Sequence, residues 1–262
     1  MIATNALRST ARVTADRPPA SATVLSMTPP QRSRRRVRAG ESLYRIGEEF
    51  RMLYVVRMGV FKSTTLSDDG LMQVTGFHMT GDAIGLDGID TGAHQTEAVA
   101  LEDSEVFALP FAQCEQWSHD SEHGQRLMMR TLAREIVRNQ EHMIMLGSMR
   151  AEQRLATFLL DQSERYGRIG YSRTQFRLRM TRQEIGSYLG LKLETISRLL
   201  SRFHQEGLIH VQGKSISLLD INALMRVSGT SANRPRAAID PILDRNGQLA
   251  GSAPGGRATE YL

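Results

Sequence analysis

The sequence contains one cysteine, Cys114, among 262 residues. A single thiol excludes an internal disulfide framework and any cysteine-rich zinc or iron-sulfur cage within one chain. It also fits a reducing compartment, so we expect a cytoplasmic protein. No apolar run approaches the roughly 18 to 20 residues that a membrane-spanning helix needs, and the first residues lack the apolar core of a secretory signal. We therefore expect no membrane partner.

Catalytic groupings are missing as well. No stretch pairs a nucleophile with a general base or shows metal-ligand spacing, so we expect neither an enzyme nor a metal site. Lys and Arg number 33 against 28 Asp and Glu, a formal net charge of +5 with a pI near 9.7. This balance favours a polyanionic partner, although many proteins without one carry a similar charge. The length and the 40% hydrophobic content suit two modest domains.

Both ends of the chain have the composition of unfolded segments. Residues 1–35 lack sustained periodicity, contain Asp16 as their one acid and end in arginines, which predicts a disordered basic arm. The arm is either a solvated leader or a phosphate contact, and a start at Met27 is an alternative. Residues 225–262 are rich in Gly, Ser, Ala, Pro and Arg, which predicts a disordered tail.

Residues 36–120 alternate short apolar stretches with turn signals. Tyr54–Val56 lead into Gly59, and Val60 and Phe61 follow it, a pattern typical of strand, bend and strand. Several such strands at roughly ten-residue spacing predict an antiparallel β jelly roll.

Within this region, Gly81–Gly85 resembles the phosphate cradle of cyclic-nucleotide-binding domains. Such a site also needs an arginine, because burying a phosphate without a counter-charge carries a heavy desolvation cost. No Arg or Lys occurs from Asp82 through Pro110. We therefore expect a domain of this fold that binds no cyclic nucleotide.

Residues 121–149 contain no proline and follow a helical period. A heptad seam runs along them: Met129, Leu132, Ile136, Asn139, Met143 and Leu146. The seam either packs on the jelly roll of its own chain or pairs with a second helix. Asn139 favours pairing, because one buried Asn lowers stability yet fixes two-stranded register by bonding to its symmetry mate. We predict a homodimerisation helix.

Residues 150–224 predict a winged helix-turn-helix domain. A helix over 151–167 with Gly167 as its stop precedes a short strand at 176–178. Two β-prone runs, 209–211 and 215–218, flank a Gly-Lys turn and predict a hairpin wing.

The helix-turn-helix motif itself spans 180–207. Thr181 and Glu184 form a capping box that begins the first helix, and Gly190 supplies the turn. The periodicity predicts that the second helix buries Leu193, Ile196, Leu199, Leu200 and Phe203.

The outward face of this second helix carries Glu194, Ser197 and Arg198 near its N-terminal end. A recognition helix reads base edges from there, with Arg binding guanine O6 and N7 and Glu accepting from cytosine N4. The residues around it that we expect to contact DNA phosphates are Thr181, Arg182, Lys192, Arg202 and Lys214. Lys192 occupies the N-cap position, where Ser or Thr would add roughly 1 kcal/mol, so it is either a phosphate contact or a tolerated weak cap.

The order of jelly roll, heptad helix and winged helix resembles the CRP/FNR family of bacterial transcription regulators over residues 36–224. Two motifs are similar to the FNR branch of that family: TGFHMTGDAIGLDGI at 75–89 and MTRQEIGSYLGLKLETISRLL at 180–200. In that branch, the positions matching Glu194, Ser197 and Arg198 read a TTGAT half-site, twice, in an inverted repeat. The resemblance implies double-stranded DNA as a partner, and an activator that contacts RNA polymerase.

The sequence departs from the FNR branch in its sensor. Members of that branch hold a [4Fe-4S] cluster with three N-terminal cysteines and one on the strand before the dimer helix. This chain has no cysteine before Cys114, and Phe107 stands at the internal position, so we expect no cluster. The seam position matching Asn139 is acidic in that branch, where like charges oppose pairing. Neutral Asn139 therefore predicts a dimer that needs no cluster.

Three alternatives remain open from the sequence. Cys114 is a candidate redox residue, but a lone Cys is commonly a small buried hydrophobe. Haem ligation by His78 or His94 competes with a structural role for each His. A β-roll protein that senses a ligand or binds a partner, and has lost specific DNA binding, is a different class of function. The intact face of Glu194, Ser197 and Arg198 argues against it.

Overall fold

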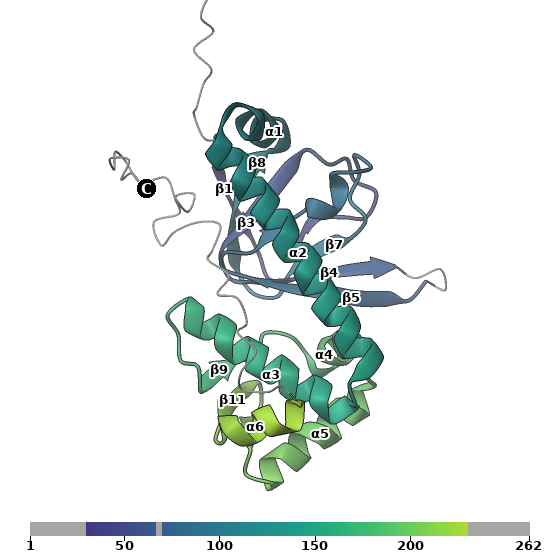
Figure 1. Cartoon of the computed structure of the whole chain (residues 1–262). Helices are drawn as coiled ribbons and strands as arrows, with labels where there is room; N and C mark the ends of the chain where they lie inside the picture. Colours follow the sequence, from purple (N-terminus) through teal and green to yellow (C-terminus); the bar gives the residue numbers. More distant parts are fainter. Residues whose placement is uncertain (1–29, 67–69, 230–262) are drawn as a thin grey trace, which may run out of the picture.

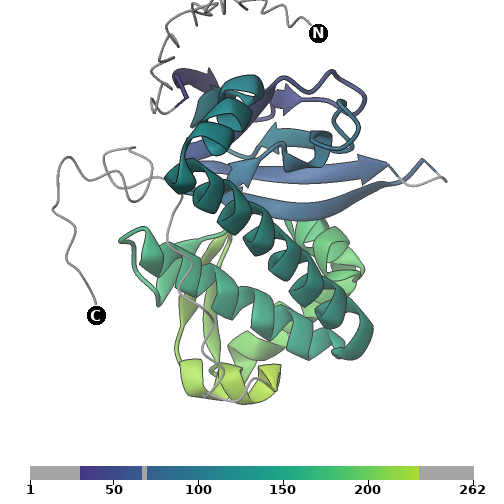
Figure 2. The same ribbon diagram turned by 45° about the horizontal axis from the view of Figure 1, so that its top comes forward.

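The computed structural model describes residues 30–66 and 70–229. It has an N-terminal β-domain and a C-terminal mainly helical domain, and one long helix, α2, runs along both (Figures 1 and 2). No helix among the described residues is long and apolar enough to cross a membrane.

The β-domain consists of two four-stranded antiparallel sheets, with strand orders β1-β8-β3-β6 and β2-β7-β4-β5. The strands are β1 (Ser33–Val37), β2 (Ser42–Tyr44), β3 (Met52–Met58), β4 (Val60–Leu66), β5 (Met72–Met79), β6 (Ala83–Ile84), β7 (Glu97–Ala100) and β8 (Ser104–Pro110), with the short 3-10 helix η1 (Leu86–Gly88) after β6. This arrangement confirms the antiparallel β-domain that the sequence predicts.

Side chains alternate between two cores along the strands, as the two-residue period of a strand requires. On β3, Tyr54 and Val56 enter the core between the sheets, where Phe61 of β4 is fully buried. Leu53 and Val55 point to the opposite face, which the following helices cover. Gly59 makes the predicted bend between β3 and β4 with a φ of +97°, and a Cβ there would lie 2.0 Å from Ser104 Oγ.

Strand β1 begins at Ser33, so the prediction of a disordered arm is wrong for residues 33–35. Arg34 pairs across the strands with Phe107, and Arg36 pairs with Glu105. Both guanidinium groups lie within 4 Å of the Glu105 carboxylate, at 3.9 and 3.8 Å, and its side chain is only 9% exposed. A basic run is typical of solvated chain, but this one pairs with β8 along all five residues of β1, and the Glu105 carboxylate lies near two of its arginines. Residues 1–29 of the predicted arm lie outside the described residues.

Helices α1 (Phe111–Asp120) and α2 (Glu122–Ser148) follow the β-domain. Ser121 caps α2, because its Oγ accepts a hydrogen bond from Gly124 N at 3.2 Å. The 27 residues of α2 give a rod about 40 Å long. Near its start Leu127 packs with Trp117 of α1 in the outer core of the β-domain, and near its end Met145 joins the core of the C-terminal domain. The helix therefore connects the two domains mechanically.

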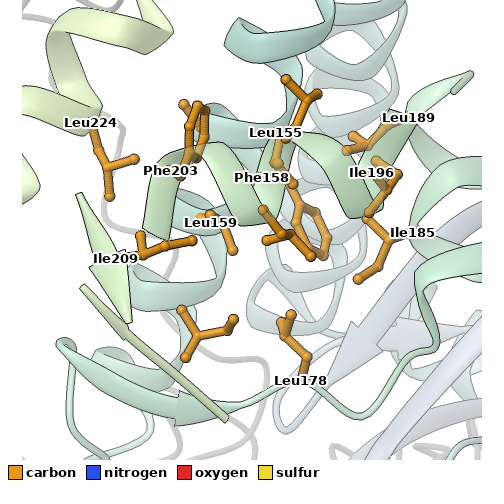
Figure 3. Close-up of a cluster of buried hydrophobic side chains, with 14 of the residues drawn as sticks. Leu155, Phe158, Leu159, Leu178, Ile185, Leu189, Ile196, Phe203, Ile209 and Leu224 are labelled. Carbon is orange, nitrogen blue, oxygen red and sulfur yellow. The ribbon is translucent and has the colours of Figure 1, made fainter. Parts of the chain in front are cut away.

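The C-terminal domain is built from α3 (Ala151–Arg168), β9 (Gln175–Arg177), α4 (Arg182–Leu189), α5 (Leu193–Gln205), β10 (Ile209–Gln212), β11 (Ser215–Leu218) and α6 (Ile221–Ser228). Apolar side chains from these elements converge on one core (Figure 3), in which Leu155, Leu159, Ile196 and Phe203 are fully buried. Strands β10 and β11 form the predicted hairpin and pair with β9.

Two boundaries in this domain differ from the predictions. Residues 225–228, predicted as disordered tail, belong to α6, which Asp220 caps by accepting from Ala223 N at 2.8 Å and which buries Leu224 completely. Helix α3 runs past its predicted stop at Gly167 to Arg168, and the left-handed turn falls on Gly170 instead, with a φ of +88°. Residues 230–262 lie outside the described part of the chain.

The hairpin of β4 and β5 lies directly against α4. Lys62 Nζ on β4 donates to Glu184 Oε1 at 2.8 Å, and Val74 N on β5 donates to Ser187 Oγ at 2.9 Å. The Phe77 ring packs 5.1 Å from the ring of Tyr188. The β-domain therefore contacts the first helix of the helix-turn-helix through charge, hydrogen bonds and apolar packing together.

The buried His78 of β5 makes stability depend on pH. Burial lowers its pKa to about 3, with Arg138 acting in the same direction and Asp82 opposing it. In the unfolded state this His binds a proton near pH 6.5, whereas in the folded state it stays neutral down to about pH 3. Between these values the unfolded state therefore binds one more proton than the folded state. We expect this His to reduce the free energy of unfolding by up to about 1.4 kcal/mol per pH unit as pH falls from about 6.5 towards 3.

Urea unfolding at fixed protein concentration between pH 7.5 and 4 checks this expectation. His78→Gln cannot titrate, so its stability should fall less steeply with acid than that of the wild type. His119→Gln, at a side chain that is 89% exposed, should follow the wild-type curve. Identical slopes for wild type and His78→Gln would show that other groups cause the acid sensitivity.

Candidate nucleic-acid interface

The first helix of the motif, α4, begins with the capping box that the sequence predicts. Thr181 Oγ1 accepts from Glu184 N at 3.2 Å, and Glu184 Oε2 accepts from Thr181 N at 2.6 Å. Glu184 is also the partner of Lys62. The ion pair across the domains therefore includes the same carboxylate that begins α4.

A glycine allows α4 to approach the chain that leads into α5. A Cβ on Gly186 would lie 2.6 Å from the carbonyl oxygen of Leu191, and Leu191 N donates to Gly186 O at 2.8 Å. Gly190 ends α4 in the left-handed region with a φ of +62°, which confirms the predicted turn. These two glycines determine the angle between α4 and α5.

Helix α5 has one buried and one exposed face, and it lies at the lower end of the C-terminal domain in Figure 1. Its apolar residues Ile196, Leu199, Leu200 and Phe203 are buried in the core, as predicted. On the opposite side, Glu194 and Arg198 are exposed, and Ser197 is half-buried between them. The structure therefore places the three predicted base-reading residues together on the outward side of one helix.

The predicted burial of Leu193 is wrong, because its side chain is 44% exposed. Leu193 is the first residue of α5, immediately before Glu194. The periodicity of the helix puts Leu193 with the apolar set, but the turn from Gly190 brings the helix start out of the core. An apolar side chain beside the reading face is a feature that the sequence pattern did not reveal.

The residues predicted to contact DNA phosphates have different surroundings. Thr181, Arg182 and Lys192 are exposed at the starts of α4 and α5, and Arg182 Nη1 donates to Ser197 Oγ at 3.3 Å. Lys192 makes no side-chain cap to α5. These residues surround the reading face as the prediction requires. The amide groups of the first turn of α5 and the positive end of its dipole also face this region.

The other two predicted phosphate contacts are engaged within the protein. Lys214, in the β10–β11 turn, donates from Nζ to the carbonyl oxygen of Arg179 at 2.9 Å. Arg202 pairs with Glu152 of α3 at 2.8 Å and with Glu206 at 3.5 Å. A phosphate contact by either residue stays a prediction, and for Arg202 it requires the exchange of two carboxylate partners.

The predicted dimerisation seam lies on the surface of α2. Met129, Ile136 and Met143 are 60, 58 and 64% exposed, and Asn139 is exposed among them. The opposite face of the helix carries the residues that pack on the same chain, so the exposed seam is not the packing stripe of the β-domain. Leu132 and Leu146 are half-buried against their own chain.

Two further apolar residues widen this seam beyond the heptad pattern. Val137 and Ile144 are 52 and 54% exposed on the same helix, each directly after a seam residue. A monomeric surface rarely carries a contiguous apolar strip of this kind, so the strip is a candidate contact surface. The heptad count alone did not identify these two positions.

The candidate sensor residues are buried. Cys114 is 5% exposed, and burial raises the pKa of its thiol to about 11, which disfavours the reactive thiolate. His78 Nε2 lies 3.0 Å from Ser63 Oγ, and the His94 ring stacks on Tyr44 at 3.6 Å between centroids. Phe107, at the position of the internal cluster ligand, lies in the outer core of the β-domain. The described residues contain no group of three or more His, Cys, Asp or Glu arranged to hold a metal ion.

Comparison with known proteins agrees with this arrangement. Residues 34–121 match the cyclic nucleotide-binding domain family, and residues 153–227 match the Crp-like helix-turn-helix domain family. Over 198 residues the chain is 43% identical to the transcriptional regulatory protein btr of Bordetella pertussis, a match that covers 76% of this chain and 82% of btr. The chain belongs to the CRP/FNR family of transcription regulators.

Other relatives of this CRP/FNR protein are also transcription regulators. Over 197 residues it is 41% identical to the fumarate and nitrate reduction regulatory protein of Escherichia coli K12, covering 75% of this chain and 79% of that protein. Among solved structures it is similar to FixK2 from Bradyrhizobium japonicum, with a TM-score of 0.71, 30% identity, and coverage of 77% of this chain and 100% of FixK2. The family consists of transcription regulators rather than enzymes, and its helix-turn-helix is a DNA-binding domain.

The close approach at Gly186 predicts an unusual response to alanine. Gly→Ala inside a helix normally stabilises a protein by about 1 kcal/mol, but the Cβ of Gly186→Ala would press on the Leu191 carbonyl, which cannot rotate away. We expect Gly186→Ala to lower the melting temperature and weaken DNA binding. Gly147→Ala in α2, where nothing lies within 4 Å of the new Cβ, should not destabilise the protein. Thermal unfolding of both variants checks this, and equal stabilisation would contradict the close approach.

Proposed function

We propose that this protein is a homodimeric transcription activator that binds the inverted repeat TTGAT-N4-ATCAA, one half-site for each α5. The observation that carries the proposal is the outward face of α5, where Glu194, Ser197 and Arg198 lie together while the opposite face is buried. The resemblance of this segment to the FNR branch supplies the base sequence. The identity of 41% to the Escherichia coli fumarate and nitrate reduction regulatory protein supports that choice.

Two residues of this face have a defined type of partner in a major groove. Arg198 donates two hydrogen bonds to guanine O6 and N7, and Glu194 accepts from cytosine N4. Leu193, exposed beside Glu194, is suited to contact the methyl group of thymine. Arg182 and Lys192, at the helix starts, neutralise the neighbouring phosphates and hold the helix in register.

Two half-sites one helical turn apart require two copies of the helix-turn-helix, one from each protomer. The exposed seam of α2 supports pairing through this helix, with Asn139 meeting its symmetry mate. Val137 and Ile144 extend the apolar area available to the second copy. Because Asn139 carries no charge, the pairing needs no cofactor to overcome repulsion.

We propose that the regulator works without a cyclic nucleotide, an iron-sulfur cluster or haem. The single cysteine cannot supply four thiolates. Beside the cradle segment Gly81–Gly85, Asp87 Oδ2 accepts from Gln95 N at 2.9 Å, from Thr96 N at 2.8 Å and from Thr96 Oγ1 at 2.8 Å. The chain's own carboxylate thus already occupies these three hydrogen-bond donors.

Activation through contact with RNA polymerase is the commoner mode of the family, and we extend it to this protein on that basis. The competing hypothesis is a ligand-sensing or partner-binding protein without specific DNA binding. Preservation of the polar face of α5, together with the unpaired apolar seam of α2, favours a dimeric DNA reader over it.

Binding to a TTGAT-N4-ATCAA duplex tests the proposal. The purified protein, in air and free of ligand, should bind this duplex far more tightly than a scrambled one, with a loss of about a thousandfold or more in affinity between 50 and 200 mM salt. Arg198→Ala should weaken binding by about 1 to 3 kcal/mol and relax the preference at one base pair. Arg226→Ala, at an exposed arginine on α6, serves as the matched control.

Fluorescence anisotropy with the palindrome, single-base variants and scrambled DNA gives these quantities. Equal affinity for palindromic and scrambled DNA would reject a specific regulator. A uniform loss across all single-base variants in Arg198→Ala would reassign Arg198 to a phosphate contact.

A charge at the centre of the seam should weaken the dimer. Asn139→Asp places two carboxylates opposite each other across the symmetry axis, so we expect a shift towards monomer in sedimentation velocity. Gln116→Glu adds the same charge at an exposed residue of α1, outside the seam of α2, and should leave the dimer intact. An unchanged dimer for Asn139→Asp would place the interface elsewhere.

A further inference from the structure

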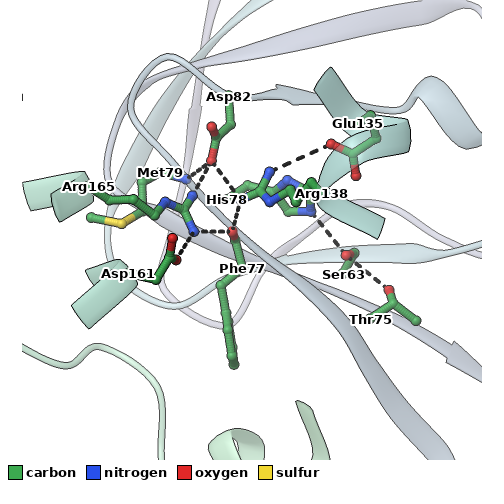
Figure 4. A network of polar contacts seen from close by, with 10 residues as sticks. All are labelled: Ser63, Thr75, Phe77, His78, Met79, Asp82, Glu135, Arg138, Asp161 and Arg165. Carbon is green, nitrogen blue, oxygen red and sulfur yellow. Dashed lines mark hydrogen bonds and ion pairs between the residues drawn. The ribbon is translucent and has the colours of Figure 1, made fainter. Parts of the chain in front are cut away.

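Two arginines from different helices bind the same pair of oxygen atoms at the junction of the domains (Figure 4). Arg138 Nη2 of α2 donates to Phe77 O at 2.7 Å and to Asp82 Oδ2 at 3.2 Å. Arg165 of α3 donates to Phe77 O at 3.0 Å through Nη1 and to Asp82 Oδ2 through Nη2. Asp82 lies in the turn between β5 and β6, and it also accepts from Met79 N at 2.8 Å.

The electrostatics make Asp82 the centre of this cluster. Two guanidinium groups held at one carbonyl oxygen repel each other, and a carboxylate between them removes that repulsion. Burial on its own would raise the pKa of the Asp82 carboxyl, but Arg165 and Arg138 outweigh burial and hold the pKa well below its usual range. Glu135 lies 3.6 Å from Arg138, and Asp161 lies 3.9 Å from Arg165, so each arginine also has a carboxylate on its own helix.

Helices α2 and α3, which both contact the turn between β5 and β6 here, have different tasks in the proposed dimer. Helix α2 carries the seam that pairs with the second copy. Helix α3 carries Leu155, Phe158 and Leu159 of the core on which α5 packs. The chain between the two helices is short, since α2 ends at Ser148 and α3 begins at Ala151. Arg154 of α3 contacts this junction directly, because it donates to Leu146 O at 2.6 Å and to Met149 O at 3.0 Å. The contacts of Asp82 lie further along both helices and add a second constraint on the angle between them.

We propose that Asp82, between Arg138 and Arg165, is a positioning residue that fixes the angle between α2 and α3 and so determines the spacing of half-sites that the dimer accepts. This inference rests on the proposed homodimeric DNA binding and adds to it the source of spacing selectivity. Asp82 touches no DNA and reads no base. It acts through the orientation of the C-terminal domain relative to the dimer axis.

Half-site spacing is a sensitive measure of that angle. Each base pair added to the spacer moves the second half-site by about 3.4 Å and turns it by roughly 35° around the DNA axis. A dimer whose two C-terminal domains are held rigidly tolerates neither change. Without the Asp82 contacts, the two domains can reorient to fit the new distance and angle. Loss of the cluster therefore reduces the difference in affinity between the preferred spacer and the other spacers.

The test compares wild type, Asp82→Asn and Glu164→Gln on palindromes with 3, 4 and 5 spacer base pairs and on a single half-site. Asp82→Asn keeps the size of the side chain and removes its charge. We expect its preference for the 4-base-pair spacer over the others to fall by roughly tenfold, with unchanged affinity for the single half-site. Glu164→Gln removes an ion pair with Arg168 inside α3, at 2.7 Å, and should retain the wild-type spacing profile.

A second variant covers the case in which Asp82→Asn does not fold. Arg138→Met removes the contact from α2 and leaves Asp82 bound to Arg165. It should reduce the preference for the 4-base-pair spacer in the same way. A folded dimer of either variant with the wild-type spacing profile overturns the inference. An equal loss on every duplex, the single half-site included, also overturns it, because a general loss of folded protein is then sufficient.

A readout without DNA separates this inference from the proposed function. Amide hydrogen exchange around residues 146–153, where α2 meets α3, should accelerate in Asp82→Asn and not in Glu164→Gln. If wild type shows no preference for the palindrome, the proposed function fails, and the exchange result alone decides whether Asp82 fixes the angle. Unchanged exchange in Asp82→Asn rejects the positioning role.

Discussion

The burial of one face of α5 is the constraint on which the rest of the structure depends. Ile196, Leu199, Leu200 and Phe203 fix the rotation of the helix about its own axis, and this rotation turns Glu194 and Arg198 outward. A rotation by one residue would carry the polar face about 100° away, since a helix has 3.6 residues per turn. The core of the C-terminal domain therefore determines which side chains meet a base edge.

Features that depend on neighbours in the sequence were predictable. The capping box of Thr181 and Glu184 and the left-handed Gly190 follow from local chemistry, and both are present. The solvent exposure of the seam on α2 also agrees with its heptad pattern. Leu193 shows the limit of periodicity at a helix end, because the preceding turn, and not the helical repeat, decides whether the first residue is buried.

Features that depend on distant partners were not predictable. The arginines of β1 resemble a solvated arm until Glu105 is placed beside them, about seventy residues further along the chain. The short helix α6 becomes stable by burying Leu224 in the core. The pairing of Lys62 with Glu184 joins residues 122 positions apart. No repeat or spacing indicates which lysine meets which glutamate, because that choice is made by the packing of whole domains.

In our interpretation, side-chain packing in the β-domain stabilises permanently the arrangement that a bound cofactor would stabilise only when present. Phe107 occupies the position of an internal cluster ligand, lies in the apolar core beneath α1 and α2, and has the guanidinium of Arg32 5.1 Å from its ring centroid. Apolar burial and the cation–π contact tie the start of β1 to β8 without an inorganic group. Above the same sheet, α2 carries a neutral Asn139 where a charge would oppose pairing. Both features support our proposal of a regulator that works without a cofactor and is controlled by its abundance or by a partner.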